Sequence, residues 1–133
     1  MAITFFVDEN LGINLVHGLR SLGHTNIEHI HETFEPGVID EEWLKYVGEN
    51  RFAIITKDRN IRKNPREKAL LKKYNVIAFY LGGNQKGITE IGKQLMNIWD
   101  KMEQCAKRQQ KKGIAGAFRI TPAGGKIEVI PLE

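Results

Sequence analysis

The strongest structural signal in the chain is "ITFFVDEN" at residues 3–10, where an apolar run ends abruptly in two acids and an amide. Apolar residues that follow one another without alternation are typical of a strand covered on both faces of a sheet. The same pattern occurs in "AIIT" (53–56) and "VIAFYL" (76–81), whereas "NIEHIHE" (26–32) alternates and predicts a weaker strand at an edge. We therefore expect a sheet whose central strands are buried.

Helical patterns separate these strands. "LGINLVHGLRSLG" (11–23) has leucines at helical spacing, and "DEEWLKYVGEN" (40–50) begins with Asp40 as a candidate N-cap. "NPREKALLKKY" (64–74) opens with an Asn-Pro pair that suits the start of a helix. Strands and helices that alternate in this way predict an α/β fold, a three-layer α/β/α sandwich with a mostly parallel sheet.

The pattern changes in the last third of the chain. Apolar residues at helical spacing from Ile88 to Met102 predict one amphipathic helix, which continues into the basic run "KRQQKK" (107–112). This run is either a solvated helix end or a contact for RNA or an acidic partner. "GAFRITPAGGKIEVIPL" (116–132) predicts a β-hairpin around its Pro-Ala-Gly-Gly turn.

Length and composition indicate one ordinary globular unit. The chain has 133 residues, 41% of them hydrophobic, and we expect a single domain over 1–133 with its core at about 3–107. The last helix and the hairpin either close this fold or form a homodimer surface. Cys105 is the only cysteine, which excludes an intramolecular disulfide and a cysteine-based zinc site. Because no apolar run approaches the roughly 20 residues of a membrane span, we expect a soluble cytoplasmic protein with no membrane partner.

Charge is distributed unevenly along the chain, although the net charge is only +4. Residues 1–50 contain nine acids and two bases, whereas residues 57–73 contain eight bases and two acids. Such asymmetry predicts an acidic centre beside a basic rim, and the rim favours an anionic partner.

Acidic side chains recur where the predicted strands end. Asp8 and Glu9 follow the first strand, Asp58 follows the third, and Asp40 opens the second helix. Ligand sites in parallel sheets form just beyond the carboxyl ends of the strands, so these acids are expected to converge. Converging carboxylates repel one another unless a cation offsets the repulsion, and oxygen ligands favour Mg²⁺ or Mn²⁺. The alternative is that each acid only caps a helix or begins a turn.

Two segments carry a family resemblance. "FFVDENLGINLVHGLRSLGH" and "PGVIDEEWLKYVGENRFAIITKDRNIRK" resemble the short PIN-like nuclease proteins in the order of their Asp-Glu-Asn, Asp-Glu-Glu and Thr-x-Asp motifs, over about residues 3–81. The PIN group includes VapC-type toxins, which are Mg²⁺- or Mn²⁺-dependent ribonucleases neutralised by an antitoxin. The resemblance therefore implies a hydrolase that cuts RNA phosphodiester bonds with a metal-activated water, and an antitoxin as a protein partner.

The resemblance also implies roles for individual residues. Asp8 corresponds to the first metal-binding and catalytic Asp, Asp40 lies where the family has its middle acid, and Asp58 corresponds to the acid after the Thr. Asn60 stands where the family commonly has a further Asp, and an amide can bind a metal but brings no charge. We therefore expect either one ion rather than two or weaker binding, with Glu9 and Asn60 as additional candidate ligands.

Residues next to these acids complete the predicted site. Thr56 either orients Asp58 or a water through its hydroxyl, or is only a strand residue. Asn10 either positions a ligand or caps the first helix. Four cations flank the third acid and are expected to bind substrate phosphates without reading the base sequence: Lys57, Arg59, Arg62 and Lys63.

Two other functions fit parts of the pattern. A non-catalytic α/β module could bind nucleic acid or an acidic protein through the basic rim, and metal dependence would distinguish it from a nuclease. A receiver-like signalling domain also has an acidic pair after its first strand and an Asp after its third. That fold expects a Lys at the end of its final parallel strand, where this chain instead has a hairpin.

Overall fold

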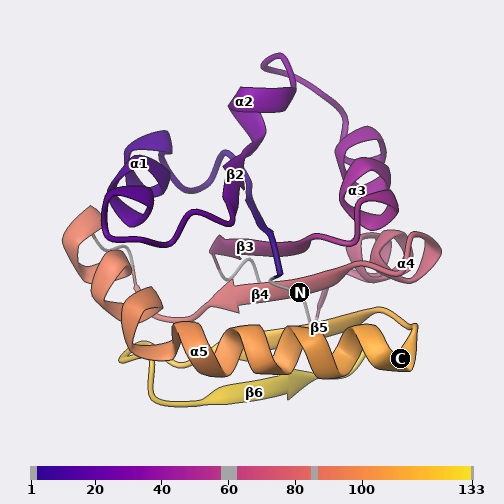
Figure 1. Ribbon diagram of the computed structural model, residues 1–133. Helices are drawn as coiled ribbons and strands as arrows, with labels where there is room; N and C mark the ends of the chain where they lie inside the picture. The colour runs from indigo at the N-terminus through magenta and orange to yellow at the C-terminus, as the bar shows by residue number, and fades with distance from the viewer. Residues whose placement is uncertain (1–2, 58–62, 85–86, 133) are drawn as a thin grey trace.

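The computed structural model describes residues 3–57, 63–84 and 87–132, and its arrangement can be followed in Figure 1. Strands and helices alternate along the first two thirds of the chain, as the sequence predicts. The strands are β1 (Phe5–Val7), β2 (Ile27–His29), β3 (Ala53–Lys57), β4 (Ile77–Leu81), β5 (Gly116–Ile120) and β6 (Ile127–Ile130). The helices are α1 (Ile13–Ser21), α2 (Ile30–Thr33), α3 (Asp40–Glu49), α4 (Pro65–Lys73) and α5 (Ile88–Lys112).

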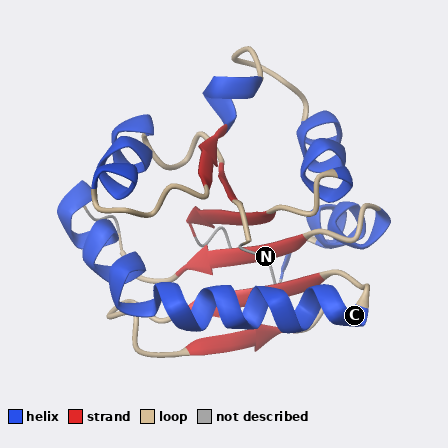
Figure 2. Ribbon diagram, viewed as in Figure 1, coloured by secondary structure: helices blue, strands red, loops and turns tan. Residues whose placement is uncertain are grey.

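The described strands form one six-stranded sheet in the order β2-β1-β3-β4-β5-β6. Neighbours from β2 to β5 pair in parallel, and only β6 is antiparallel, to β5. Figure 2 shows the strands side by side with helices around them. The predicted α/β fold with a mostly parallel sheet is confirmed. The predicted hairpin is also present, and its first strand joins the main sheet by pairing with β4.

Helices cover both faces of the sheet and give the molecule three layers. On one face, α1 and α5 pack on the strands, and Phe5 lies edge-on to Trp99 of α5 with ring centroids 5.1 Å apart. On the other face, α3 and α4 provide the cover, and Phe6 stacks on Trp43 of α3 at 5.8 Å. Neighbouring residues of β1 thus serve opposite faces, which explains why the strand is continuously apolar.

The long helix α5 ends where the sequence changes character. Gly113 follows it with φ +71°, a left-handed conformation that glycine adopts without strain, and Lys111 and Lys112 lie in its last turn, where cations interact favourably with the helix dipole. No helix in residues 3–57, 63–84 and 87–132 is long and apolar enough to cross a membrane.

The segment predicted as an edge strand over 26–32 is only partly a strand. β2 does lie at the edge of the sheet, but it stops at His29, and the residues after it form the short helix α2. His29 caps this helix: its Nδ1 accepts a hydrogen bond from the backbone N–H of His31, and its own N–H donates to Glu32. These side-chain hydrogen bonds satisfy the first turn of a helix, so the chain leaves the sheet despite its alternating pattern.

Candidate active site

The parallel register places three polar side chains in a row at the carboxyl edge of the sheet. Val7 pairs with Ile55, so Asp8 comes next to Thr56 on the neighbouring strand. Thr56 in turn pairs with Tyr80 of β4. Because side chains alternate between faces along a strand, all three belong to the face covered by α3 and α4. The row thus joins three adjacent strands at the edge where ligand sites form in parallel sheets.

Asp8 is the acid of this row and is buried, with 2% of its surface exposed. Its Oδ2 accepts a hydrogen bond from the Thr56 hydroxyl at 2.7 Å and one from Asn10 Nδ2 at 3.2 Å. Its Oδ1 accepts a third from the backbone N–H of Asn10 at 3.1 Å. A buried carboxylate is strongly disfavoured unless polar groups surround it, and these donors supply that environment.

Asp8 and Asn10 do not cap the first helix. α1 begins at Ile13, and its N-cap is Gly12, which makes no side-chain capping hydrogen bond. Glu9 is largely exposed, and its carboxylate lies 3.8 Å from Nε2 of His31. The capping alternative for the acids after β1 is therefore wrong, and Asn10 instead holds the Asp8 carboxylate.

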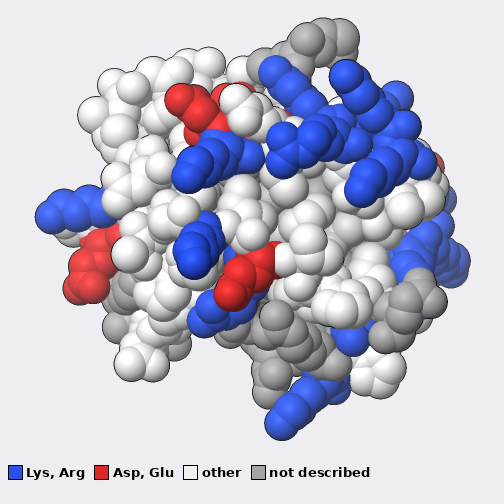
Figure 3. All heavy atoms as spheres, turned by 90° about the horizontal axis from the view of Figure 1, so that it is seen from below, with Lys and Arg blue, Asp and Glu red and all other residues white. Residues whose placement is uncertain are grey.

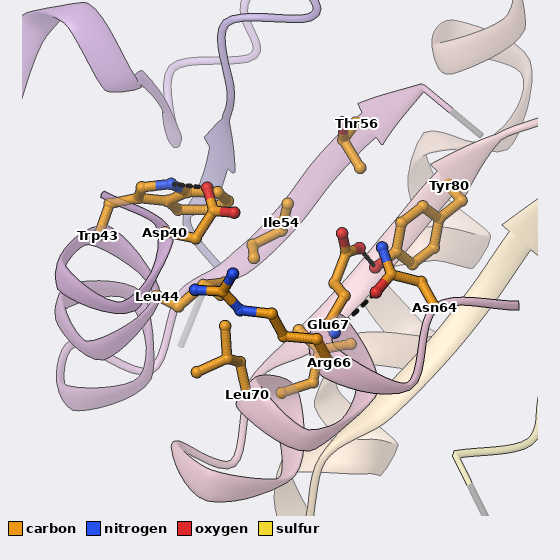
Figure 4. A pocket seen from close by; sticks show the side chains of 11 residues that line it. Asp40, Trp43, Leu44, Ile54, Thr56, Asn64, Arg66, Glu67, Leu70 and Tyr80 are labelled. Carbon is orange, nitrogen blue, oxygen red and sulfur yellow. Dashed lines mark hydrogen bonds between the residues drawn. The ribbon is translucent and has the colours of Figure 1, made fainter. Parts of the chain in front are cut away.

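A pocket of about 190 Å³ opens beside this row, between α3, β3 and α4. Figure 4 shows Asp40 on one side of it and Glu67 on the other, with Ile54 of β3 between them and Thr56 further along the same strand. Thr56 both lines this pocket and donates its hydroxyl to the buried Asp8, so the strand-end carboxylate lies next to a residue of the pocket wall. The polar or charged lining residues are Asp40, Thr56, Asn64, Arg66, Glu67 and Tyr80.

Asp40 occupies a different position from the one its sequence context predicts. The N-cap of α3 is Ile39, and Asp40 is the first helical residue, with no capping hydrogen bond from its side chain. Its Oδ1 instead accepts from the indole Nε1 of Trp43 at 3.2 Å. The predicted cap is wrong, and the indole of Trp43, itself buried, holds the carboxylate at the pocket. Its place in the first turn is also favourable, since helix N-termini attract negative charge.

Glu41, the acid that follows Asp40, differs from it in role. Glu41 accepts hydrogen bonds from Lys73 Nζ at 2.5 Å and from the Tyr74 hydroxyl at 2.6 Å, which join α3 to the end of α4. The hydrogen bond from Lys73, followed by that from Tyr74, lowers the pKa of Glu41. Glu41 is not among the residues that line the pocket. It therefore serves as a structural tie and a natural control for Asp40.

Glu67 and Tyr80 are pocket residues that sequence reasoning missed. The hydroxyl of Tyr80 donates to Glu67 Oε2, and the Glu67 backbone N–H donates to Oδ1 of Asn64, the predicted and observed N-cap of α4. In the sequence, Glu67 looks like an ordinary acid of a first helical turn. The signal that could have found Tyr80 is its place in β4, level with Thr56 in a parallel sheet. Arg66 also lines the pocket and gives it a cation. It was missed because it looks like an ordinary charged residue of a first helical turn.

The remaining predicted residues are placed as follows. Lys57 ends β3 and is half-buried, and Lys63 is exposed just before α4. Four predicted residues, Asp58, Arg59, Asn60 and Arg62, lie outside the described residues. The sequence predicts that Thr56 either orients Asp58 or a water through its hydroxyl, or is only a strand residue. In the structure its hydroxyl donates to Asp8.

The donor set of this region suits a hard divalent cation. Asp8 and Asp40 offer carboxylate oxygens, which Mg²⁺ and Mn²⁺ prefer, and Thr56 lies between Asp8 and the pocket. Within residues 3–57, 63–84 and 87–132 no three His, Cys, Asp or Glu side chains form a ready metal-binding group. The described acids can therefore supply part of a ligand set, to which the predicted third acid, Asp58, would add.

Comparison with known proteins identifies a family. No curated protein and no solved structure matches the chain. Residues 3–83 match the family described as PIN-like domain, a stretch that includes β1 to β4 and the whole candidate site. PIN-like domains have a nuclease-type fold and are often nucleases that use divalent metals. The match covers more than half of the chain, and the protein therefore belongs to the PIN-like domain family.

Proposed function

We propose that the protein is a cytoplasmic endoribonuclease of the PIN-like type, dependent on Mg²⁺ or Mn²⁺, that cuts RNA phosphodiester bonds with a water nucleophile. The observation that supports this most is the buried carboxylate of Asp8, which is hydrogen-bonded to Thr56, a residue that also lines the Asp40 pocket. A carboxylate held in this way at the end of a parallel strand suits the role of a metal ligand. The match to a family whose members typically use divalent metals supports this role.

In this proposal Asp8, Asp40 and Asp58 hold the cation. A bound divalent ion polarises a phosphate oxygen and lowers the pKa of a water molecule that it binds. The chain itself supplies orientation: Thr56 and Asn10 fix the Asp8 carboxylate, and Trp43 fixes that of Asp40. Side chains fixed before the substrate arrives need no reordering during the reaction, which lowers its barrier.

The RNA backbone would be bound by cations around the pocket. Arg66 lines the pocket, and Lys57 and Lys63 lie at the end of β3 and just before α4. Arg59 and Arg62, which the sequence places in the same basic segment, extend this set. Contacts of this kind bind phosphates regardless of base sequence, so binding should weaken as salt rises.

The test is cleavage of a labelled single-stranded RNA by the purified protein with Mn²⁺ or Mg²⁺, with EDTA as the metal-free reference. Asp8→Asn and Asp40→Asn should each lower the cleavage rate on the order of 100-fold or more, the usual scale for removing a group that stabilises developing charge. Glu41→Gln is the matched control, because it neutralises the acid next to Asp40 that ties α3 to α4 and does not line the pocket.

Two results would decide against this function. If the RNA stays intact with every metal while gel-shift binding persists in EDTA, the protein is a non-catalytic binding module. If Glu41→Gln lowers cleavage as much as Asp40→Asn, the loss reflects the fold rather than the proposed ligands.

We further propose that the protein is the toxin of a toxin–antitoxin pair. Its expression should then arrest growth of the host cell, and Asp8→Asn should relieve the arrest at equal protein level. Growth that is unaffected by an expressed protein active on RNA in vitro would contradict the toxin role and leave the nuclease role intact.

A further inference from the structure

A second concave surface lies on the opposite side of the sheet, between the C-terminal half of α5 and the β5–β6 hairpin. We call it the hairpin groove, and its volume is about 530 Å³. Four cations line it, and the described lining residues include no Asp or Glu. The cations are Lys101, Arg108 and Lys112 of α5 and Lys126 of the hairpin. Figure 3 views the molecule from the side of α5 and the hairpin, and Lys and Arg atoms gather over much of its right-hand part.

The floor of the hairpin groove is apolar. Phe118, Ile127 and Val129 line it together with the buried Cys105, and Val129 is 71% exposed. An exposed β-branched residue inside a cationic rim combines apolar contact with charge. The groove is therefore suited to a ligand that carries apolar groups and negative charges together, rather than to a simple anion.

The hairpin groove also borders an edge of the sheet. β6 is the last strand in the sheet order, and an edge strand presents backbone N–H and C=O groups to any further strand. The opposite edge is blunted: β2 has three residues, and Arg20 Nη2 donates to the carbonyl of Ile27 at 2.8 Å. Of the two edges, β6 is thus the one better able to accept another strand.

We propose that the hairpin groove binds an acidic, strand-forming segment of a partner protein, which adds to the sheet beside β6. Its backbone would pair with β6, its apolar side chains would contact Val129 and Ile127, and its carboxylates would face the cations of α5. The dimensions agree, because the four residues of β6 span about 13 Å and the rise from Lys101 to Lys112 is about 16 Å. α5 and β6 run alongside each other in Figure 1, so one extended segment passes both.

A protein segment fits this surface better than single-stranded RNA does. Proteins that bind single strands without reading sequence stack bases on exposed aromatic rings, and the one aromatic residue of the groove, Phe118, is only 7% exposed. The groove lies on the α5 side of the sheet, whereas the candidate active site lies on the side of α3 and α4. An RNA strand bound at both would have to pass around the sheet.

The test uses a fluorescein-labelled synthetic peptide of about ten residues, twice the length of a typical strand. Its repeated Glu-Glu-Val-Val pattern places both residue types on each face of a strand, so that acids and apolar groups can face α5 together. Fluorescence anisotropy with the full-length protein should show saturable binding that weakens with salt. The same peptide N-methylated at alternate residues, and a peptide with a repeated Lys-Lys-Val-Val pattern, should each bind at least tenfold more weakly. N-methylation removes the N–H groups needed for strand pairing and leaves the charge unchanged.

Protein variants locate the site. Arg108→Glu and Lys112→Glu should each weaken binding of the acidic peptide about tenfold, a change of about 1.4 kcal/mol. Lys93→Glu is the matched control, because Lys93 is an exposed lysine of the same helix that does not line the groove. Amide NMR shifts on titration should concentrate in β6 and the second half of α5.

Three outcomes would overturn the proposal. Equal affinity for the N-methylated peptide would mean that charge alone attracts the ligand. Equal weakening by Lys93→Glu, or NMR shifts confined to the Asp8 region, would place the binding elsewhere. If no peptide binds, and a labelled single-stranded RNA binds in a way that Arg108→Glu abolishes, the groove is a nucleic-acid surface.

Discussion

The hydrogen bond from Thr56 to Asp8 yields the sharpest test of the candidate site. Thr56→Val keeps the shape of the side chain and removes only the hydroxyl that donates to the carboxylate at 2.7 Å. Both residues are 2% exposed or less, so the hydrogen bond lies away from bulk solvent. A hydrogen bond to a charged group contributes about 1.5–3 kcal/mol, so we expect a loss of about 2 kcal/mol in the free energy of unfolding.

Urea denaturation at neutral pH measures this loss, and thermal unfolding gives a second reading. For a chain of this length, about 2 kcal/mol corresponds to a fall in Tm of about 6–10 °C. Thr56→Ser is the matched control, since it keeps the hydroxyl and removes a methyl group. It should cost about 1 kcal/mol through lost apolar burial. The two variants therefore separate the hydrogen bond from packing.

The same pair tests function independently of stability. In the RNA cleavage assay, at a temperature where all proteins are folded, Thr56→Val should lose most activity and Thr56→Ser should keep most of it. A Val variant within about 0.5 kcal/mol of the parent, below the usual net contribution of a hydrogen bond, would refute the structural reasoning. A Ser variant as inactive as the Val variant would show that the hydroxyl is not what the site requires.

Three further substitutions test the fold. Arg20 holds the pKa of Glu32 at about 2, below its usual 4.5. Glu32→Gln should therefore lower stability by about 1 kcal/mol in urea melts above pH 4.5, and the difference should shrink below pH 4.5 and disappear as pH falls through about 2. Tyr80→Phe removes the hydroxyl that donates to Glu67 and should cost about 1–2 kcal/mol, whereas no change would show that the bond contributes little. Gly48→Ala places a Cβ 2.3 Å from the backbone carbonyl oxygen of Tyr74, the C-cap of α4, and should lower the free energy of unfolding by about 1–3 kcal/mol. An unchanged urea midpoint would contradict this close approach.

The fold was largely predictable because its signals are local. Continuous apolar runs marked the buried parallel strands, and helical periodicity marked the helices between them. The segment over 26–32 misled because its helical end depends on hydrogen bonds among His29, His31 and Glu32 that alternation does not encode. The pairing of β5 with β4 joins strands separated by the whole of α5, and no local pattern specifies such a contact.

The site was only partly predictable for a related reason. Asp8 and Asp40 could be found because acids at strand ends and helix starts stand out in a sequence. Glu67 and Tyr80 could not, because their role depends on the register of β4 and on how α4 lies over the sheet. Residues that acquire a role through register can be recognised from the sequence only once the strands have been aligned with one another.

The position of Asp8 argues that function, rather than stability, keeps it there. An acid that caps a helix stabilises the fold, but the N-cap of α1 is Gly12, and the carboxylate of Asp8 accepts hydrogen bonds from Thr56 and Asn10. A buried carboxylate must be removed from water, and its hydrogen bonds often do no more than compensate, so an apolar residue of similar size is often as stable or more stable. Asp8→Asn should therefore leave the free energy of unfolding nearly unchanged, or raise it, while abolishing RNA cleavage. A large loss of stability in this variant would show instead that the carboxylate is there to hold β1 against β3.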